Sequence, residues 1–385
     1  MYKRFLSYPE ELTAMLALRG LNNDAEKLAL QSAMARVTDK QKFLDKLLKS
    51  ELLSICFPAL ASTLPQSYIG FAKQEKKEVE TRIADMFEQL GHLGHRFNAQ
   101  GLKVVALKNG GLAQFHLDDL GSHPMGDIDL MVSKSSFLDA HQEIIDAGFV
   151  LEFRSEYEED SISAAYLNGG AEYSKKLDSG CIMWLELSYR SVSGRWINQD
   201  KEPRADDFLL RSIPAPISGI HILSPEDNLL QVSIHTAKHT YFRAPGIRLH
   251  LDVHRVCGLF DIDWELFEKR VLASETQTAV YFSLLSAREL LGTGIPDCTM
   301  TNLKPTFWKI VFFNYFFRNV RLGERFIPNR IGFIAFQVSL YDSLENLIAV
   351  LIPKPGKVRK LGQSLFFSYL VHFLDLIGIR KIHKK

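Results

Sequence analysis

The stretch GDIDLMV, residues 126–132, decides how this chain of 385 residues is interpreted. Its polar and apolar residues alternate, which is typical of a β-strand, and the alternation puts Asp127 and Asp129 on one face and Ile128 and Leu130 on the other. Two aspartates on one face repel each other, and a divalent cation relieves that repulsion. Mg²⁺ prefers oxygen ligands of this kind, so the pair is a candidate metal site.

A second Asp-Ile-Asp, in FDIDWEL at residues 260–266, stands in a different context. Asp263 directly precedes the helical pattern WELFEKR, where its side chain can accept the unpaired amide hydrogens of a first turn. Asp261 adds a favourable negative charge near the same helix end. We therefore interpret the second copy as a helix cap.

The residues before the first pair predict a strand, a glycine turn and a short helix. LKVVALK, at residues 102–108, is a β-branched run that is typical of a buried strand. NGGLAQFHLDDL follows, and its Gly110 and Gly111 at a helix start would present backbone amides to a phosphate with no side chain in the way. This order of elements makes an anion site beside the aspartates a reasonable hypothesis.

A third carboxylate is expected from a later strand. CIMWLELSY, residues 181–189, predicts a strand in which Glu186 interrupts an apolar run, and a lone carboxylate there needs a cation or a donor. Together with the two aspartates, Glu186 would complete a site for two ions about 3.5–4 Å apart. The alternative is that the aspartates cap loops while Glu186 pairs with Arg190 or Arg195.

Helical patterns surround these strands and predict four regions. Residues 1–100 are helical, and their last helix has an apolar stripe of period 3.6 that ends at Gly101 and is formed by Val79, Ile83, Met86, Leu90, Leu93 and Phe97. Residues 101–222 hold the strands, 223–303 form a helical domain that opens with the cap SPED, and 304–385 form a last helical region. We expect an α+β fold, in which a small mixed β-sheet with an α/β-like core is flanked by N-terminal and C-terminal helical regions.

The composition is that of an ordinary globular protein, with 46% hydrophobic and 24% charged residues and a net charge of +1. The charge is unevenly distributed, because residues 304–385 contain 14 Lys and Arg against 4 Asp and Glu, together with 15 aromatic residues. A basic, aromatic segment can contact a membrane surface or RNA. It can equally be a helical domain with a basic outer face.

Several features predict a cytoplasmic protein. Charged residues at positions 3, 4, 10 and 11 interrupt any early apolar run, so we expect no signal peptide. The most apolar late stretch contains Asp342 and Glu345, which makes it a poor membrane span. The four cysteines lack zinc or disulfide spacing and are expected to be reduced core thiols without a disulfide partner: Cys56, Cys181, Cys257 and Cys298.

At these residues the chain resembles the DNA polymerase β-like nucleotidyltransferase superfamily. That superfamily has a glycine turn, then Asp-x-Asp on a strand, then an acidic residue on a later strand. More narrowly, VVALKNGGLA, GDIDLMV, WLELSYR and LSPEDNLLQVSIHTAKH echo, in the same order, the bacterial branch of uncharacterised nucleotidyltransferase family proteins. The likeness runs from about residue 40 to residue 275 and makes 101–222 the nucleotidyltransferase core.

The resemblance implies a role for each motif. Asp127 and Asp129 would bind both metal ions, Mg²⁺ or Mn²⁺, and Glu186 would bind the ion that activates an acceptor hydroxyl. Gly110 and Gly111 would contact the triphosphate of a nucleoside triphosphate such as ATP. Lys108, which looks like the lysine that precedes the family's glycine, would contact a phosphate; the alternative is a strand-end lysine in solvent.

The chain departs from the family pattern at two positions. Asn109 stands where the branch commonly has glycine, and His123 stands where an arginine often precedes the acidic pair. The first change puts the turn geometry in question, and the second puts a phosphate or backbone contact in question. Neither removes an expected metal ligand.

The segment IHTAKH, residues 234–239, predicts a helix beside the site. His235 and His239 are spaced i, i+4 with Asp252 on the next helix, but a zinc site of the H-E-x-x-H type would need a Glu after the first His, and none is there. We expect the histidines to pack or to contact a nucleotide. Lys238 is a candidate for the triphosphate, and an exposed lysine on a solvated face is the alternative.

The function expected from this pattern is Mg²⁺-dependent transfer of a nucleoside monophosphate to an acceptor hydroxyl. The acceptor would be a small molecule or a glycan precursor. Two alternatives remain: a toxin-type transferase acting on a tRNA or a protein, and a non-catalytic binding protein that keeps the fold. In the first, the basic region 304–385 would face RNA; that region could also hold the protein at a membrane.

Overall fold

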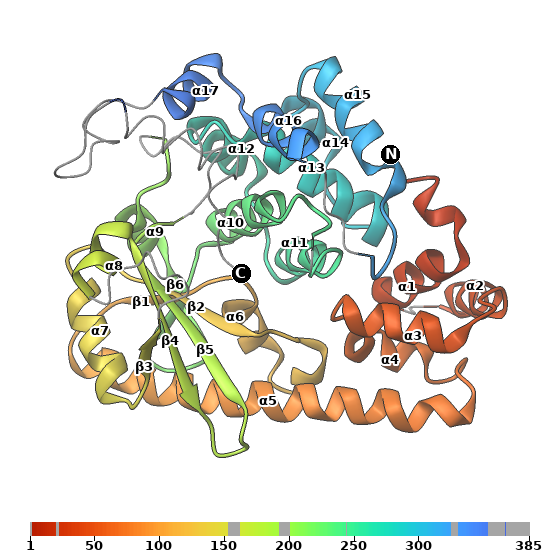
Figure 1. The fold of residues 1–385 in the computed structure, drawn as a ribbon, viewed down its shortest axis with the longest axis horizontal. Coiled ribbons are helices and arrows are strands. Elements are labelled where there is room, and N and C mark those ends of the chain that lie inside the picture. Colours follow the sequence, from red (N-terminus) through yellow and green to blue (C-terminus); the bar gives the residue numbers. More distant parts are fainter. Residues whose placement is uncertain are drawn as a thin grey trace.

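The computed structural model describes residues 2–20, 23–152, 162–191, 201–243, 245–324, 330–352 and 366. Within them, a seven-stranded mixed sheet lies between N-terminal and C-terminal helices, which confirms the predicted α+β class. Figure 1 shows the sheet at one end of the molecule, the first helices at the other end, and the later helices above both.

The sheet combines parallel and antiparallel pairs. Its order is β3-β4-β5-β2-β1-β7-β6; β2 runs parallel to β5 and β1 parallel to β7, and the other neighbours are antiparallel. The strands are β1 Val104–Ala106, β2 Asp127–Met131, β3 Val150–Glu152, β4 Gly170–Lys176, β5 Ile182–Ser188, β6 Ile213–Pro214 and β7 Ile220–Ile222.

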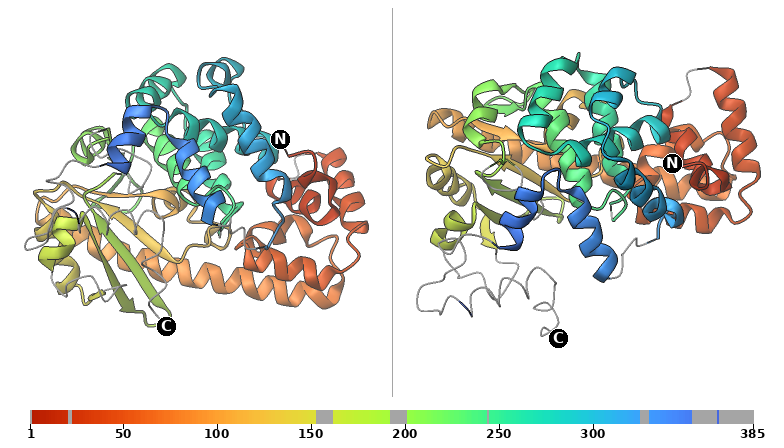
Figure 2. Two further views of the ribbon diagram at one scale, coloured as in Figure 1. Left: turned by 45° about the horizontal axis from the view of Figure 1, so that its top comes forward. Right: turned by 90° about the horizontal axis from the view of Figure 1, so that it is seen from above.

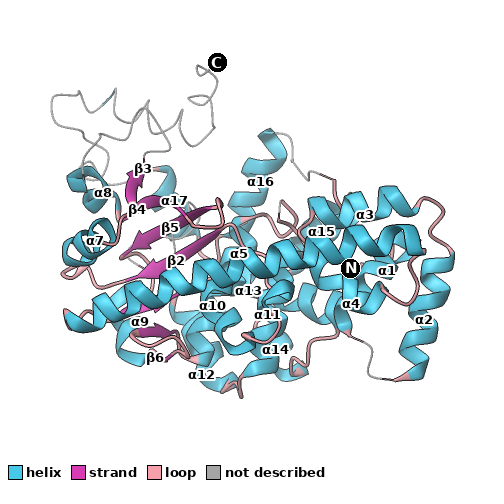
Figure 3. Ribbon diagram, turned by 90° about the horizontal axis from the view of Figure 1, so that it is seen from below, coloured by secondary structure: helices cyan, strands magenta, loops and turns pink. Residues whose placement is uncertain are grey.

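Helices precede, interrupt and follow the strands, and Figure 3 distinguishes them from the strands by colour. Those before the sheet are η1 Phe5–Ser7, α1 Pro9–Arg19, α2 Asp24–Ala35, α3 Lys40–Lys49, α4 Leu53–Leu60 and α5 Gln66–Ala99. Those between strands are α6 Lys108–Leu112, η2 Ala113–His116, η3 Leu120–Ser122, α7 Phe137–Asp146, α8 Ile162–Asn168 and α9 Ala205–Arg211. Those after the sheet are α10 Pro225–Lys238, α11 Arg248–Leu259, α12 Trp264–Ala273, α13 Gln277–Ser286, η4 Ala287–Leu291, α14 Asp297–Asn302, α15 Phe307–Phe316, η5 Phe317–Asn319, α16 Arg330–Leu340 and α17 Leu344–Leu351.

The long helix α5 connects the two ends of the molecule. Figures 1 and 3 show it running from the N-terminal helices to the sheet. All six residues of its predicted apolar stripe are buried, and Gly101, at φ +66°, follows its end as predicted. With α7, this stripe covers the sheet face that carries Ile128 and Leu130.

The opposite sheet face is directed toward the later helices. Val105 and Met131 share a core cluster with apolar residues of α10 and α11, whereas Ile128 and Leu130 belong to the cluster of α5 and α7. Because side chains alternate along a strand, Asp127 and Asp129 lie on the same face as Met131. The acidic pair therefore lies between the sheet and the α10–α11 side.

Both predicted helix caps are present. The Ser224 side chain accepts a hydrogen bond from the Asp227 amide at 3.4 Å, with Pro225 at the first position of α10. The Asp263 side chain accepts from the Leu266 amide at 2.9 Å, which confirms the capping interpretation of the second Asp-Ile-Asp.

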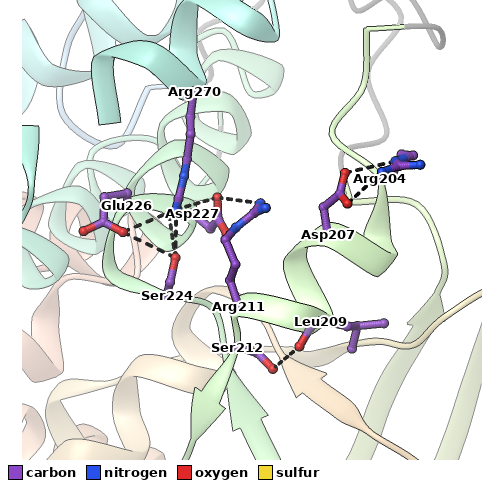
Figure 4. Close-up of polar contacts among 9 residues, drawn as sticks. All are labelled: Arg204, Asp207, Leu209, Arg211, Ser212, Ser224, Glu226, Asp227 and Arg270. Carbon is purple, nitrogen blue, oxygen red and sulfur yellow. Dashed lines mark hydrogen bonds and ion pairs between the residues drawn. The ribbon is translucent and has the colours of Figure 1, made fainter. Parts of the chain in front are cut away.

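The N-terminal end of α10 is held by a buried ion-pair network, shown in Figure 4. The fully buried Asp227 carboxylate lies between two guanidinium groups, with Arg211 Nε at 2.7 Å and Arg270 Nη1 at 2.9 Å. Arg270 also donates to Ser224 Oγ at 2.9 Å. Because both cations come from neighbouring helices, α9 and α12, the network fixes the helix that carries Lys238 at its other end.

The N-terminal residues and the helices that end at Leu340 meet the middle of the sequence in one aromatic cluster. The Tyr2 hydroxyl lies 2.7 Å from Ser286 Oγ, and the Tyr2 ring packs against Phe242 and Phe317. The same core cluster extends to Leu340. Figure 2 shows the helices α15 and α16 beside those of the middle region. The four predicted regions thus share a core, and their division stays a prediction.

The structure tests the expectations for the cysteines and for membrane-spanning helices in part. Cys56 is buried as expected, but Cys181 and Cys257 are half-buried and Cys298 is exposed, so the prediction of core thiols is correct for Cys56 only. No helix among the described residues is long and apolar enough to cross a membrane. The most basic part of the C-terminal region, 353–365 and 367–385, lies outside the described residues.

Two glycines of α5 test how closely this helix must approach the sheet. A Cβ on Gly94 would overlap the Ser218 carbonyl oxygen, whereas a Cβ on Gly91 would have no atom within 4 Å. We expect Gly94→Ala to lower the free energy of unfolding by about 1–3 kcal/mol. Gly91→Ala should raise it by about 0.5–1 kcal/mol, because alanine favours a helix interior. Urea unfolding of both variants measures this, and equal effects would contradict the close approach.

Candidate active site

The pairing of β2 with β5 brings the predicted carboxylates together. In the parallel register Asp129 is the partner of Glu186, and Asp127 is the partner of Trp184. Residues that are partners in register point to the same face of a sheet. Asp127, Asp129 and Glu186 therefore share one face, at the centre of the sheet.

The acidic row extends over two further strands. Glu172 on β4 is the register partner of Glu186, and Glu152 on β3 is the partner of Glu172. Four neighbouring strands thus place Glu152, Glu172, Glu186 and Asp129 side by side, and we call these residues the acidic row. Sequence analysis missed Glu172 and Glu152. The alternation in GAEYSKK indicates an amphipathic strand, but the register with a strand elsewhere in the chain cannot be read from it.

Sequence analysis left open that Glu186 pairs with Arg190 or Arg195, and the structure tests this for Arg190. Arg190 Nη2 lies 2.7 Å from Glu202 Oε2, so that guanidinium is engaged with another carboxylate. Arg195 lies outside the described residues.

Burial and like charge both act on Glu186. Its pKa is raised to about 7, first by burial and then by the negative charge of Asp129, with a smaller contribution from Glu172. The charges of Lys108 and Lys238 act in the opposite direction. A carboxyl group held this way gains free energy from any additional cation that binds beside it.

Lys108 supplies the nearest positive charge. Its Nζ donates to Asp129 Oδ1 at 2.8 Å. Burial acts to lower the pKa of Lys108, but the charges of Asp129, Glu186 and Asp127 outweigh burial and raise it. Lys108 is therefore not a strand-end lysine in solvent.

The backbone of Lys108 is strained. Its φ is +53°, a left-handed conformation that is uncommon for residues other than glycine and has a cost of order 1–3 kcal/mol. Lys108 is the first residue of α6, two positions after the end of β1. The strained turn directs its ammonium group to the acidic row, and such strain occurs most often at functional sites.

Gly110 and Gly111 let α6 pack closely on the sheet. A Cβ on Gly111 would lie 2.6 Å from the Ala106 carbonyl oxygen, and one on Gly110 would lie 3.3 Å from Ile128. The Gly111 amide donates to the Leu107 carbonyl at 3.3 Å, whereas Gly110 belongs to the first turn of α6. Packing thus gives both glycines a structural role, and their contact with a triphosphate stays a prediction.

The two departures from the family pattern contact each other. Asn109 Oδ1 lies 3.1 Å from His123 Nδ1, and Asn109 Nδ2 donates to the Pro124 carbonyl at 3.2 Å. Burial, and next the charge of Arg255, lower the pKa of His123 to about 2, so this histidine is neutral. Arg255 Nη2 also donates to the Ser122 carbonyl at 2.6 Å. These bonds connect the start of α6 with the segment that leads into β2.

The α10–α11 side faces the acidic row with cationic groups. The Lys238 side chain reaches solvent, yet its pKa is lowered by burial and then by the charge of Lys108, while Glu186 and Asp129 oppose this. The half-buried His235 has a pKa lowered well below its usual value, chiefly by burial and then by Lys108. Lys238 is exposed, as the alternative expected, and its contact with a triphosphate stays a prediction.

Arg248 on α11 is a second cation on this side, and we call Lys238 and Arg248 the cationic wall. Arg248 Nε lies 2.7 Å from Glu51 Oε2, and its buried Nη1 is among the described side-chain atoms without a hydrogen-bond partner. Burial raises the pKa of Asp252, and the charges of Arg248 and Arg255 oppose this. Sequence analysis did not single out Arg248; an arginine four positions before an aspartate on the same helix is too common to indicate a site.

The carboxylates of the site are suitable ligands for a hard cation such as Mg²⁺, although their side chains do not surround a metal position. No three His, Cys, Asp or Glu side chains within the described ranges form a group that could hold a metal ion. Asp129, which would have to contribute, is paired with Lys108 instead. The carboxylate oxygens of Asp127, Asp129 and Glu186 are nevertheless the ligand type that Mg²⁺ and Mn²⁺ prefer. Burial and the charge of Asp129 raise the pKa of Glu186, and a cation bound beside it would act against this shift.

A mixed sheet with a central acidic row, opposed by lysines from a strained turn and a neighbouring helix, is the kind of site that phosphate-transfer enzymes use to hold metal ions and polyphosphates. The comparison with protein families agrees with this class. Residues 39–292, about two thirds of the chain, match the family described as uncharacterised nucleotidyltransferase, and the chain belongs to that family. No curated protein and no solved structure matches the chain.

Replacing Lys108 tests whether the acidic row depends on one cation. We expect Lys108→Met to lower the free energy of unfolding by about 3–5 kcal/mol, because Asp129 and Glu186 lose their compensating charge. Mg²⁺ should stabilise this variant more than it stabilises the wild-type protein, because the ion can take the place of the ammonium group. Denaturant unfolding with and without Mg²⁺ measures both effects.

The exposed Lys103, just before β1, provides the control for this experiment. Lys103→Met should change the free energy of unfolding by less than about 0.5 kcal/mol. Equal losses in the two variants, or no additional stabilisation of Lys108→Met by Mg²⁺, would contradict the assigned role of Lys108.

Proposed function

We propose that this nucleotidyltransferase moves a nucleoside monophosphate from a nucleoside triphosphate to a hydroxyl group of an acceptor. The observation that carries the proposal is the register of β2 and β5, which makes Asp129 and Glu186 neighbours on one sheet face beside Lys108. Three carboxylates that reach one face from two strands have no evident structural purpose, because their mutual repulsion destabilises the fold.

The carboxylates are the proposed metal ligands. Asp127, Asp129 and Glu186 would hold Mg²⁺ or Mn²⁺, which would neutralise phosphate charge and lower the pKa of the acceptor hydroxyl. Asp129 would exchange its bond to Lys108 for the ion, and Lys108 would then be available to contact a phosphate. The strained turn keeps the Lys108 side chain near its place during this exchange.

The cationic wall is the proposed triphosphate site. The pKa of Lys238 is lowered by burial and then by the charge of Lys108, and a polyanion bound between the two lysines would relieve their repulsion. The amide of Gly110, in the first turn of α6, would add a neutral donor. Arg248, with its unpartnered Nη1, is a further candidate among the described residues of this wall.

The proposal extends to the acceptor and to the location of the protein. We favour a small molecule or a glycan precursor as acceptor, in the cytoplasm, over a tRNA, a protein or a binding function without turnover. Helix α15 exposes Phe307, Trp308 and Tyr315, so the C-terminal region offers apolar side chains for a membrane or RNA contact. Sedimentation with anionic liposomes and salt-dependent RNA binding distinguish these two contacts.

The second Asp-Ile-Asp provides a matched control for the proposed site. We expect Asp129→Asn to lower transfer at least about 100-fold, because charge stabilisation of the transferring phosphate is lost. Asp263→Asn should leave transfer unchanged, because asparagine caps a helix as well as aspartate does. Each labelled nucleoside triphosphate, with Mg²⁺ or Mn²⁺ and cell extract, is incubated with either variant, and the labelled products are separated by size. Full transfer by Asp129→Asn would falsify the assignment.

A further inference from the structure

A cavity of about 310 Å³ lies next to the start of β2. Its walls come from the α3–α4 connection, from α5, from the segment before β2 and from the start of β5. Gly126 lines the cavity, and the next residue is Asp127. One residue that lines the cavity is therefore the direct neighbour in sequence of a proposed metal ligand. The volume of the cavity is at the lower end of the range for small-molecule sites, about 300–1,000 Å³.

The cavity is lined by both hydrogen-bond acceptors and hydrogen-bond donors. Glu51 and Glu75 supply carboxylates that accept, and Arg82 supplies a guanidinium group that donates. Arg82 Nε is buried and, among the described residues, has no hydrogen-bond partner. Burial, followed by the charge of Glu78, raises the pKa of Glu75, so hydrogen-bond donors from a ligand would be favourable there.

The remaining walls of the cavity are largely apolar. Val79 and Met125 are buried, and Leu53 lies beside them on α4. Apolar side chains of this kind contact the carbon face of a ring or chain, while its polar edge reaches the charged groups. The cavity thus suits a ligand with one apolar face and several polar substituents.

We propose that this cavity binds the acceptor, and that the acceptor is a small polyhydroxylated molecule of the sugar or sugar-alcohol class. This inference rests on the proposed function for its catalytic consequence. A hydroxyl group both donates and accepts, so it can bond to Glu51 or Glu75 and to Arg82 at once. A polyanion such as RNA would meet two carboxylates, and an apolar ligand would offer no hydrogen bond to the buried Arg82 Nε.

Two further observations connect the cavity with the site. Arg248 Nε forms an ion pair with the Glu51 carboxylate at 2.7 Å. A ligand that binds Glu51 would therefore lie close to Arg248, which belongs to the cationic wall. All residues that line the cavity lie between positions 39 and 292, the part of the chain that matches the family. The cavity is thus built from the same unit as the acidic row.

The test measures binding without nucleotide or metal, so that it does not depend on turnover. Monosaccharides, amino sugars and sugar alcohols are screened one by one against the full chain by saturation-transfer NMR, and affinities are determined by calorimetry. We expect at least one of them to bind. Glu75→Gln should weaken it about tenfold, the effect of losing one hydrogen bond to a charged group. Glu88→Gln, an exposed glutamate on the same helix, is the matched control and should not change the affinity.

A second variant fills the cavity. A Cβ on Gly126 would have no atom within 4 Å, so Gly126→Leu places its side chain in open space at the cavity mouth and should abolish binding while the protein stays folded. If no compound of the three classes binds, or if binding is equal in Glu75→Gln, Glu88→Gln and wild type, the cavity is not the acceptor site. Label transfer to RNA or protein alone would likewise overturn the inference. If the wild-type protein transfers no nucleotide in any assay but binds a sugar, the proposed function is refuted, and the cavity remains a sugar-binding site.

Discussion

The repulsion between neighbouring carboxylates is the constraint on which the rest of this structure depends. Asp129 and Glu186 are partners on adjacent strands, and Glu172 and Glu152 continue the acidic row over the next two. Like charges directly opposite each other destabilise a sheet, and burial makes the effect larger. The fold offsets it with Lys108, at the expense of a left-handed backbone, and with Lys238 on a helix whose other end is fixed by buried ion pairs.

Local patterns were sufficient to predict the elements of the site. The alternation of GDIDLMV gave the strand and its acidic face, the period of 3.6 gave the buried stripe of α5, and Ser224 and Asp263 were recognisable as caps. Each of these depends on residues within a few positions of one another, where sequence and geometry are directly related. The α+β class followed from the same patterns.

Relations between distant segments could not be predicted in this way. The pairing of Asp129 with Glu186 was a hypothesis, and the pairing of Glu186 with Glu172 was not foreseen, because a strand sequence is compatible with more than one register. The mutual contact of Asn109 and His123 was also missed. Each residue looks like a separate departure in the sequence, and only the fold brings the two side chains into contact.

The aromatic cluster around Tyr241 has a consequence for how this family unit can be isolated. The match to the family covers residues 39–292, but the Tyr241 ring contacts Phe313, Phe317 and Phe336, and Tyr2 packs against Phe242 and Phe317. Cutting the chain at the limits of the match would remove these partners and leave large aromatic rings facing water. A shortened protein would then tend to aggregate, so a failure of such a fragment to work would reflect lost packing and carry no information about its chemistry.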